Sequence, residues 1–354
     1  MIQSAGVNIA DKQKKDRLYE LDYMRFIACL AVMVVHITAN GVTDYIQGSF
    51  PHIVTLIINR SFKFTTPVFA FLSGVTSFFS YKKRKFEYFP YLKKRLGRVL
   101  VPYFVWCLIY YAIYIKLGLY VFNIADFTEK VLWGKMSYHL YFVIMITQMY
   151  IVGPVFYKIL KESDKKELIL IASGVITALC ARYMTFENSD RIFLKYMVFY
   201  MLGIYVTMEH DRFISWTERN KVLIVVGYIA SSLAYAATTY YGLPIYIYSW
   251  FIFSVFSVLF VYRMGLIMCK MLKSIYSFIK LFGQASYYIY LMHPLILTMA
   301  ILYTNSHGIL SVTKRLLIYF VTVIPITVIS CLIFTAVKNK IKKHKKAALA
   351  AGKN

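Results

Sequence analysis

Charged side chains are scarce in this chain, and acidic ones are the scarcest. Only 16% of its 354 residues are charged, against about 25% in soluble domains. Together with a hydrophobic share of 59%, this shortage excludes a soluble globular protein. The chain has 16 acidic and 41 basic residues, which gives a net charge of +25. We nevertheless expect no nucleic-acid partner, because the basic residues follow the pattern of a membrane protein described below.

Cysteine is also rare, and its placement excludes a disulfide-stapled protein. The five cysteines lie singly inside apolar stretches and form no C-x-x-C pair, so no disulfide framework is indicated. We interpret them as small apolar packing residues: Cys29, Cys107, Cys180, Cys269 and Cys331.

Apolar runs long enough to cross a bilayer recur along the whole chain. A transmembrane helix needs about 20 mostly apolar residues, and we predict ten such spans, hence an all-α polytopic transmembrane bundle. The predicted spans cover residues 20–42, 62–80, 99–120, 137–157, 167–184, 192–208, 221–240, 244–265, 278–302 and 314–337. The stretch from His52 to Arg60 is amphipathic, so we expect it to lie in the membrane interface or to re-enter the bilayer.

The two ends are short and charged. We predict a tail at residues 1–19, a membrane domain at 20–337 and a basic tail at 338–354, disordered beyond Ala347. Neither tail can bury a core of its own. Since the charged start precedes a long span without a small-residue cleavage site, we expect no cleavable signal peptide.

The distribution of Lys and Arg predicts the orientation. If the N-terminus is cytoplasmic, the cytoplasmic segments hold about three times as many Lys and Arg residues as the outer ones. This is a strong positive-inside bias, which places both termini in the cytoplasm. The basic surface then faces anionic membrane lipids or an anionic cytosolic ligand.

An arginine and a histidine occupy one face of the first span. Arg25 and His36 are separated by ten uncharged residues, and eleven helical steps bring their side chains within roughly 20° of each other, about 16 Å apart along the axis. Because ionisable groups at membrane depth are costly, they indicate a functional site. On the predicted orientation, Arg25 lies at the cytoplasmic edge and His36 in the outer half of the membrane.

Two further histidines fall at a similar predicted depth. His139 opens the fourth span, and His293 lies in the ninth, where the following Pro294 leaves a backbone carbonyl free. A hydrogen-bonded core role is the alternative for each. A metal site is not favoured, since the histidines show no ligand-pair spacing and no carboxylate lies at their depth.

A basic pair precedes the third span. Arg95 and Arg98 are three residues apart and therefore share a helix face, and Pro102 fits an early helical turn. With Arg25, the pair could bind phosphate groups in bidentate fashion. The alternative is contact with lipid headgroups.

A serine and a glycine are adjacent in the second span. Ser73 and Gly74 would allow close approach of a neighbouring helix, or the serine hydroxyl would lie beside a reacting centre. No G-x-S-x-G motif accompanies them.

These motifs, in this order, resemble the acyltransferase-3 family of integral membrane acyltransferases. The pattern combines R-x10-H in the first span, an F-rich segment ending L-S-G, a basic R-x-x-R run with proline, an H-L-W/Y-F segment, a phenylalanine–glycine element and S-Y-x-I-Y-L-x-H-P. The matching residues are Arg25 and His36; Phe69, Phe71, Leu72, Ser73 and Gly74; Arg95, Arg98 and Pro102; His139 to Phe142; Phe199, Tyr200 and Gly203; and Ser286, Tyr287, Ile289, Tyr290, Leu291, His293 and Pro294. Tyr141 departs from the tryptophan that is frequent there, and the membrane carboxylates that would orient His36 are scarce.

The resemblance implies transfer of an acyl group, commonly acetyl, from cytoplasmic acyl-CoA to a hydroxyl of a surface glycan or another envelope acceptor. It implies a multi-pass protein of the bacterial cytoplasmic membrane, similar to the stand-alone subgroup of the polysaccharide intercellular adhesin membrane proteins. That subgroup has also been described as exporting polysaccharide, so an exporter or flippase without covalent chemistry is the rival reading.

The resemblance also suggests roles for the residues singled out above. Arg25, Arg95 and Arg98 would hold the phosphates of acyl-CoA. His36 would act as general base on the acceptor hydroxyl, or carry the acyl group transiently. Ser73, His139 and His293 would orient the acceptor or stabilise the oxyanion, with Ser73 and His293 counted among the catalytic residues and His139 on the acceptor side. No metal is expected.

Overall fold

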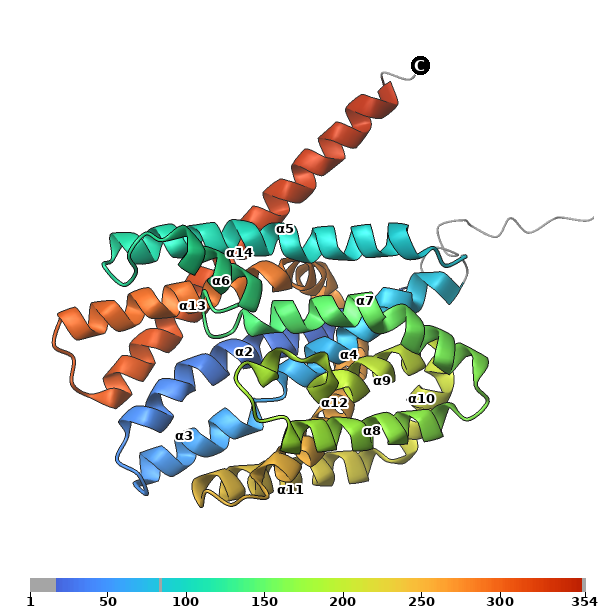
Figure 1. The fold of residues 1–354 in the computed structure, drawn as a ribbon, viewed down its shortest axis with the longest axis horizontal. Coiled ribbons are helices and arrows are strands. Elements are labelled where there is room, and N and C mark those ends of the chain that lie inside the picture. The colour runs from blue at the N-terminus through green and yellow to red at the C-terminus, as the bar shows by residue number, and fades with distance from the viewer. Residues whose placement is uncertain (1–16, 83–84, 352–354) are drawn as a thin grey trace, which may run out of the picture.

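A computed structural model describes residues 17–82 and 85–351, and their regular structure is entirely helical (Figure 1). The predicted all-α class is therefore confirmed, while most of the predicted N-terminal tail and the last three residues lie outside the described residues. The α-helices are α2 (Glu20–Asp44), α3 (Phe50–Ser61), α4 (Thr65–Phe78), α5 (Tyr88–Lys116), α6 (Ile124–Trp133), α7 (Tyr141–Glu162), α8 (Lys166–Tyr183), α9 (Met197–Met208), α10 (His210–Arg219), α11 (Lys221–Tyr240), α12 (Tyr246–Met271), α13 (Tyr276–Ser306) and α14 (Val312–Ala351).

Seven of the described helices are long and apolar enough to cross a membrane: α2, α5, α7, α11, α12, α13 and α14. The chain is therefore a multi-pass membrane protein in its architecture. The other three predicted spans coincide with helices that are too short or too charged to be counted as membrane-crossing. The helices α4 and α9 have only 14 and 12 residues, and α8 carries charged residues at both ends. The number of crossings stays a prediction, as does the orientation of the termini.

Helix α2 is the centre of the bundle. It packs against α3, α4, α12, α13 and α14, and α13 crosses the bundle beside it (Figure 1). Ion pairs mark the two ends of α2, with Glu20 bonded to His210 of α10 at one end and Asp44 to Arg315 of α14 at the other. Side chains on α2 therefore meet partners from most of the helices that build the core.

The stretch from His52 to Arg60 is helical, and its placement in the interface or as a re-entrant segment stays a prediction. It forms α3, which packs one face against α2 and α11 and leaves Ile53, Val54 and Ile58 exposed. The side chain of the buried Asn59 donates hydrogen bonds to the carbonyl of Val35 and to Thr38, both on α2, at 2.8 and 3.0 Å. A three-residue turn at 62–64 then separates α3 from α4, so the two form a broken helix. Irregular backbone at membrane depth is tolerated where it lines a cavity.

Two glycines bring α4 and α9 into direct backbone contact. A β-carbon on Gly74 would lie 2.1 Å from the carbonyl oxygen of Tyr200, and one on Gly203 would lie 2.2 Å from that of Phe71. Neither position tolerates a side chain without moving a backbone. The predicted close approach at Gly74 is therefore confirmed, and it holds α4 in the core.

Two predicted helix boundaries were wrong. Helix α5 begins at Tyr88 rather than at residue 99, so Pro102 lies inside the helix and not in its early turn. Helix α14 continues to Ala351, where we expected disorder beyond Ala347. Lys and Arg in α5, and Lys and Ala in α14, favour helices and extend each helix beyond its apolar part. Hydropathy alone does not detect such an extension.

Candidate active site

Three histidines from distant parts of the sequence meet in the core. His36 comes from α2, His139 from the turn before α7, and His293 from α13. The centroid of the His36 ring lies 5.2 Å from that of His293 and 6.5 Å from that of His139, and the other two centroids are 5.5 Å apart. The structure thus brings together the three histidines that the sequence placed at similar depth.

His293 is held in one orientation by its own helix. Its Nδ1 lies 2.9 Å from the carbonyl oxygen of Ile289, and since a carbonyl can only accept, Nδ1 carries the proton. In the neutral ring, Nε2 then keeps a free lone pair. This atom is fully buried and has no hydrogen-bond partner among the described residues. Pro294 in the next position removes a helical donor and so loosens the backbone at this point.

His139 and His36 differ in their access to the site. His139 is 3% exposed, its Nδ1 lies 3.1 Å from the hydroxyl of Ser137, and its Nε2 has no partner within the described chain. His36 is half-buried, and Tyr138 packs against its ring at 4.8 Å between centroids. Of the three imidazoles, His36 is therefore the most exposed.

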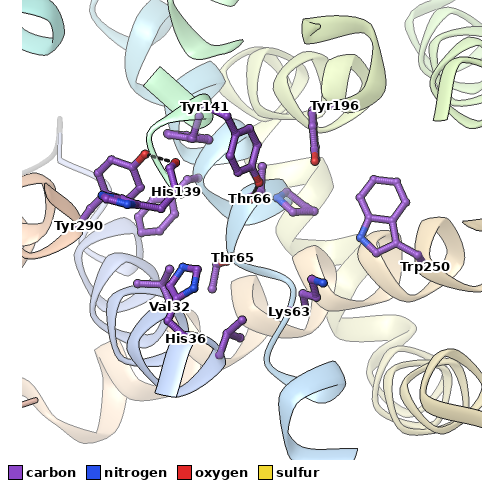
Figure 2. Close-up of a pocket in the computed structure, with 14 residues that line it drawn as sticks. Val32, His36, Lys63, Thr65, Thr66, His139, Tyr141, Tyr196, Trp250 and Tyr290 are labelled. Carbon is purple, nitrogen blue, oxygen red and sulfur yellow. Dashed lines mark hydrogen bonds between the residues drawn. The ribbon is translucent and has the colours of Figure 1, made fainter. Parts of the chain in front are cut away.

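His36 and His139 line a small cavity, which we call the histidine chamber. Its volume is about 110 Å³, and Figure 2 shows His36 and His139 toward one side, with Lys63 and Trp250 toward the other. Lys63 lies in the break between α3 and α4, and its side chain is exposed. The residues that line the chamber are Val32, Val35, His36, Lys63, Thr65, Thr66, Pro67, Phe69, His139, Tyr141, Phe142, Tyr196, Trp250 and Tyr290.

Sequence reasoning missed most of the polar and aromatic lining of the chamber. Thr66 and Tyr141 are joined by a hydrogen bond of 3.0 Å between their hydroxyl oxygens, and Tyr196 packs edge-on against Trp250 at 5.8 Å. The signal that could have found Lys63 is a cation between two mostly apolar helices, because a charge is costly at membrane depth. Trp250 and Tyr196 carry no such signal, since aromatic residues are common near the ends of spans.

The predicted phosphate-binding residues line a second cavity, the arginine cavity. It has a volume of about 310 Å³ and contains Arg25, Arg95 and Arg98 in its lining. Arg95 donates a hydrogen bond to the carbonyl of Thr76 on α4 and lies over the ring of Tyr150 at 5.8 Å. No carboxylate lines this cavity, so its described walls are positively charged.

Asp22 positions Arg25, and the sequence analysis did not single it out. Its carboxylate accepts hydrogen bonds from Arg25 at 2.8 Å, from Arg17 at 2.7 Å and from the hydroxyl of Tyr276 at 3.0 Å. Arg25 follows Asp22 by three residues, the spacing at which helical side chains meet. This spacing was the available signal.

Ser73 lies with the arginines rather than with the histidines. It lines the arginine cavity together with Thr76 and Ser286, and it is absent from the lining of the histidine chamber. A role for Ser73 beside His36 stays a prediction. Within residues 17–82 and 85–351, no three His, Cys, Asp or Glu side chains are arranged to hold a metal ion.

The two cavities share a wall of three aromatic rings. Phe69, Phe142 and Tyr290 line both the histidine chamber and the arginine cavity. We call these residues the aromatic wall. The predicted donor-binding residues and the histidines are therefore neighbours across a single layer of side chains.

Comparison with known proteins finds a family model and bacterial relatives. A family model described as an acyltransferase domain matches residues 18–335, nearly the whole chain. A Staphylococcus aureus protein named as a probable poly-beta-1,6-N-acetyl-D-glucosamine export protein is 26% identical over 312 residues, which cover 82% of this chain and 85% of that protein. A Staphylococcus epidermidis protein of the same name is 24% identical over 310 residues, 82% of this chain and 84% of that protein. No solved structure matches the chain.

Proposed function

The chain belongs to the acyltransferase family matched by that model, and on this premise we propose that it is a membrane O-acyltransferase. The donor is a cytoplasmic acyl-CoA, with acetyl as the acyl group, and the acceptor is a hydroxyl of an envelope glycan. The protein lies in the bacterial cytoplasmic membrane, with Arg25 near the cytoplasmic face and His36 in the outer half.

One observation carries this proposal: the arginine cavity and the histidine chamber meet at the aromatic wall. Guanidinium groups bind phosphate through paired hydrogen bonds, so the arginine cavity suits the phosphates of a CoA ester. The histidine chamber offers an accessible imidazole, which is the commonest general base. A thioester held by the arginines would have only this wall between it and His36.

The chemical step needs one base and one acceptor hydroxyl. His36 removes the hydroxyl proton while the oxygen attacks the thioester carbonyl, so a C–O bond forms and the C–S bond breaks. The proton then passes from His36 to the CoA thiolate, and the products are an ester and a free thiol. His293 and His139 each keep a buried nitrogen that has no hydrogen-bond partner in the described part of the chain. These nitrogens would orient the reacting groups.

The acceptor would enter the chamber from the side of Lys63 and Trp250. Trp250 and Tyr196 provide adjacent aromatic faces, on which a sugar ring can lie. Thr65 and Thr66 provide hydroxyls that can hydrogen-bond to sugar hydroxyls. These residues favour a glycan over an apolar acceptor.

The proposal is tested by acyl transfer from a labelled donor. The purified protein is reconstituted in liposomes with radiolabelled acetyl-CoA and glycan isolated from a strain that lacks the gene. Label is expected to enter the glycan as alkali-labile ester, with release of one free thiol per ester. Protein-dependent label that never appears in the glycan, or none at all with any acyl-CoA, would contradict the proposal.

Export of a polysaccharide is the second candidate, because the two relatives are named as probable export proteins. The gene deletion separates the two functions. Mass spectrometry of the surface glycan should show a normal amount of polymer without O-acyl groups if the protein is an acyltransferase. Polymer that is still acylated but retained inside the cell would favour the exporter.

A further inference from the structure

The aromatic wall is built from three helices that are far apart in sequence. Phe69 comes from α4, Phe142 from the first turn of α7, and Tyr290 from α13. The ring centroids of Phe69 and Phe142 are 6.1 Å apart, and those of Phe142 and Tyr290 are 5.8 Å apart. Phe142 therefore packs against both other rings, and all three residues lie where the two cavities adjoin.

The wall is held in place from both sides. The hydroxyl of Tyr290 donates a hydrogen bond of 2.6 Å to the backbone carbonyl of His139 (Figure 2), and its ring stacks on Tyr287 at 5.9 Å. Helix α4, which carries Phe69, is locked against α9 by Gly74 and Gly203. Moving these packed rings aside costs free energy, because added volume in a dense core destabilises a protein by about 1–3 kcal/mol.

We propose that Phe69, Phe142 and Tyr290 set the length of the acyl chain that the protein transfers. This inference rests on the proposed function, since it takes the arginine cavity as the donor site and His36 as the base. A thioester bound by the arginines has to pass its acyl group between these rings. The chamber behind them, at about 110 Å³, is much smaller than the arginine cavity at about 310 Å³, so the wall admits short chains and excludes long ones.

The size of the effect follows from the cost of each extra methylene. One added methylene in a fitted pocket changes the rate by about 10-fold or more. The wild-type protein should therefore prefer acetyl-CoA steeply over propionyl-, butyryl- and hexanoyl-CoA. Phe142→Ala removes one ring of the wall, so the ratio of the hexanoyl rate to the acetyl rate should rise by about 10-fold or more.

The experiment measures transfer rates for this series of acyl-CoA donors with wild-type protein and three variants. Phe69→Leu is a milder opening of the wall and should shift the ratio in the same direction, which covers the case in which Phe142→Ala does not fold. Phe156→Ala is the matched control. Phe156 lies on the same helix as Phe142 and is half-buried, but packs against Phe193 at 6.2 Å and lines neither cavity.

The outcomes separate this inference from the proposed function. A raised hexanoyl-to-acetyl ratio in the wall variants, with the wild-type ratio in Phe156→Ala, supports it. If the wild-type protein transfers acetyl and the folded wall variants keep the wild-type ratio, the aromatic wall does not set the chain length. The proposed acyltransferase function is then unaffected. A wild-type protein that transfers no acyl group from any donor overturns the proposed function, and the inference with it.

Discussion

The two cavities lie side by side but differ in the chemistry of their walls. The arginine cavity is lined by permanently charged side chains from α2 and α5, one of which is held by a carboxylate. The histidine chamber takes imidazoles from α2 and from the turn before α7, with a third on α13 beside them, and two of the three are almost fully buried. Fixed cations suit the binding of an anionic group, whereas neutral imidazoles suit proton transfer. The difference suggests one cavity for binding and one for chemistry.

The largest effect is expected from the imidazole of His36. His36→Ala should lower the maximal rate of acyl transfer by about 100- to 10,000-fold, because a general base contributes that much, while the KM for acyl-CoA stays near the wild-type value. The assay is acyl transfer in liposomes at saturating donor. His307→Ala is the control, since this histidine is exposed at the end of α13. Normal turnover by His36→Ala would remove the chemical role of the chamber.

A smaller effect, of a different kind, is expected from Arg25. Arg25→Ala should raise the KM for acyl-CoA by about 10- to 100-fold, since a hydrogen bond to a charged group contributes about 1.5–3 kcal/mol, with little change in the maximal rate. The measurement is donor-dependent kinetics. Arg315→Ala removes an arginine from an ion pair at the opposite end of α2 and should leave KM unchanged. An unaltered donor KM in Arg25→Ala would break the assignment of the arginine cavity to binding.

Asp22 acts on the donor through Arg25, so its effect should be weaker still. Asp22→Asn leaves the guanidinium in place but weakens its anchor, and we expect the donor KM to rise by about 5-fold, which corresponds to about 1 kcal/mol. Asp22→Glu keeps the charge and should restore part of the loss, which a merely structural role would not predict. If the asparagine variant changes the maximal rate and not KM, Asp22 does not position the donor site.

The smallest effect concerns stability at the end of the bundle away from the histidine chamber. Burial lowers the pKa of His210, but its hydrogen bonds and ion pairs with Glu20 and Asp211 outweigh burial and leave the pKa above its ordinary value. A raised pKa in the folded state stabilises the protein below about pH 6.5. This stabilisation is lost as the pH rises through the raised pKa, and its size should be about 1 kcal/mol or less.

The measurement for His210 is thermal unfolding in detergent between pH 5.5 and 8.5, about one to two units on either side of the ordinary pKa. The wild-type midpoint should fall with rising pH more than that of Glu20→Gln, whose glutamine cannot pair with the imidazolium. Parallel curves for the two proteins would show that this ion pair contributes nothing. Acyl transfer should keep the same pH profile in both, since neither cavity contains His210.

Local patterns predicted the parts of the site that lie on single helices. Arg25 and His36 were paired by helical periodicity, and Arg95 and Arg98 by their spacing; each pair lies on one helix in the structure. The three histidines lie on separate segments, and only their estimated depth in the membrane grouped them. The structure places their rings close together, as this depth predicted. The cavity that Ser73 lines was not predicted, because depth in the membrane does not determine which cavity a side chain faces. Ser73 lines the arginine cavity.

Sequence alone determined that this protein is a helical membrane bundle with a cation and an imidazole on one helix face, since hydropathy and a period of 3.6 residues are local properties. Only the tertiary structure decided which faces meet. The contact of Gly74 with α9, the broken helix at 62–64 and the aromatic wall all depend on side chains from several helices packing at one place. Such packing is set by volume and shape between distant segments, and no local pattern encodes it.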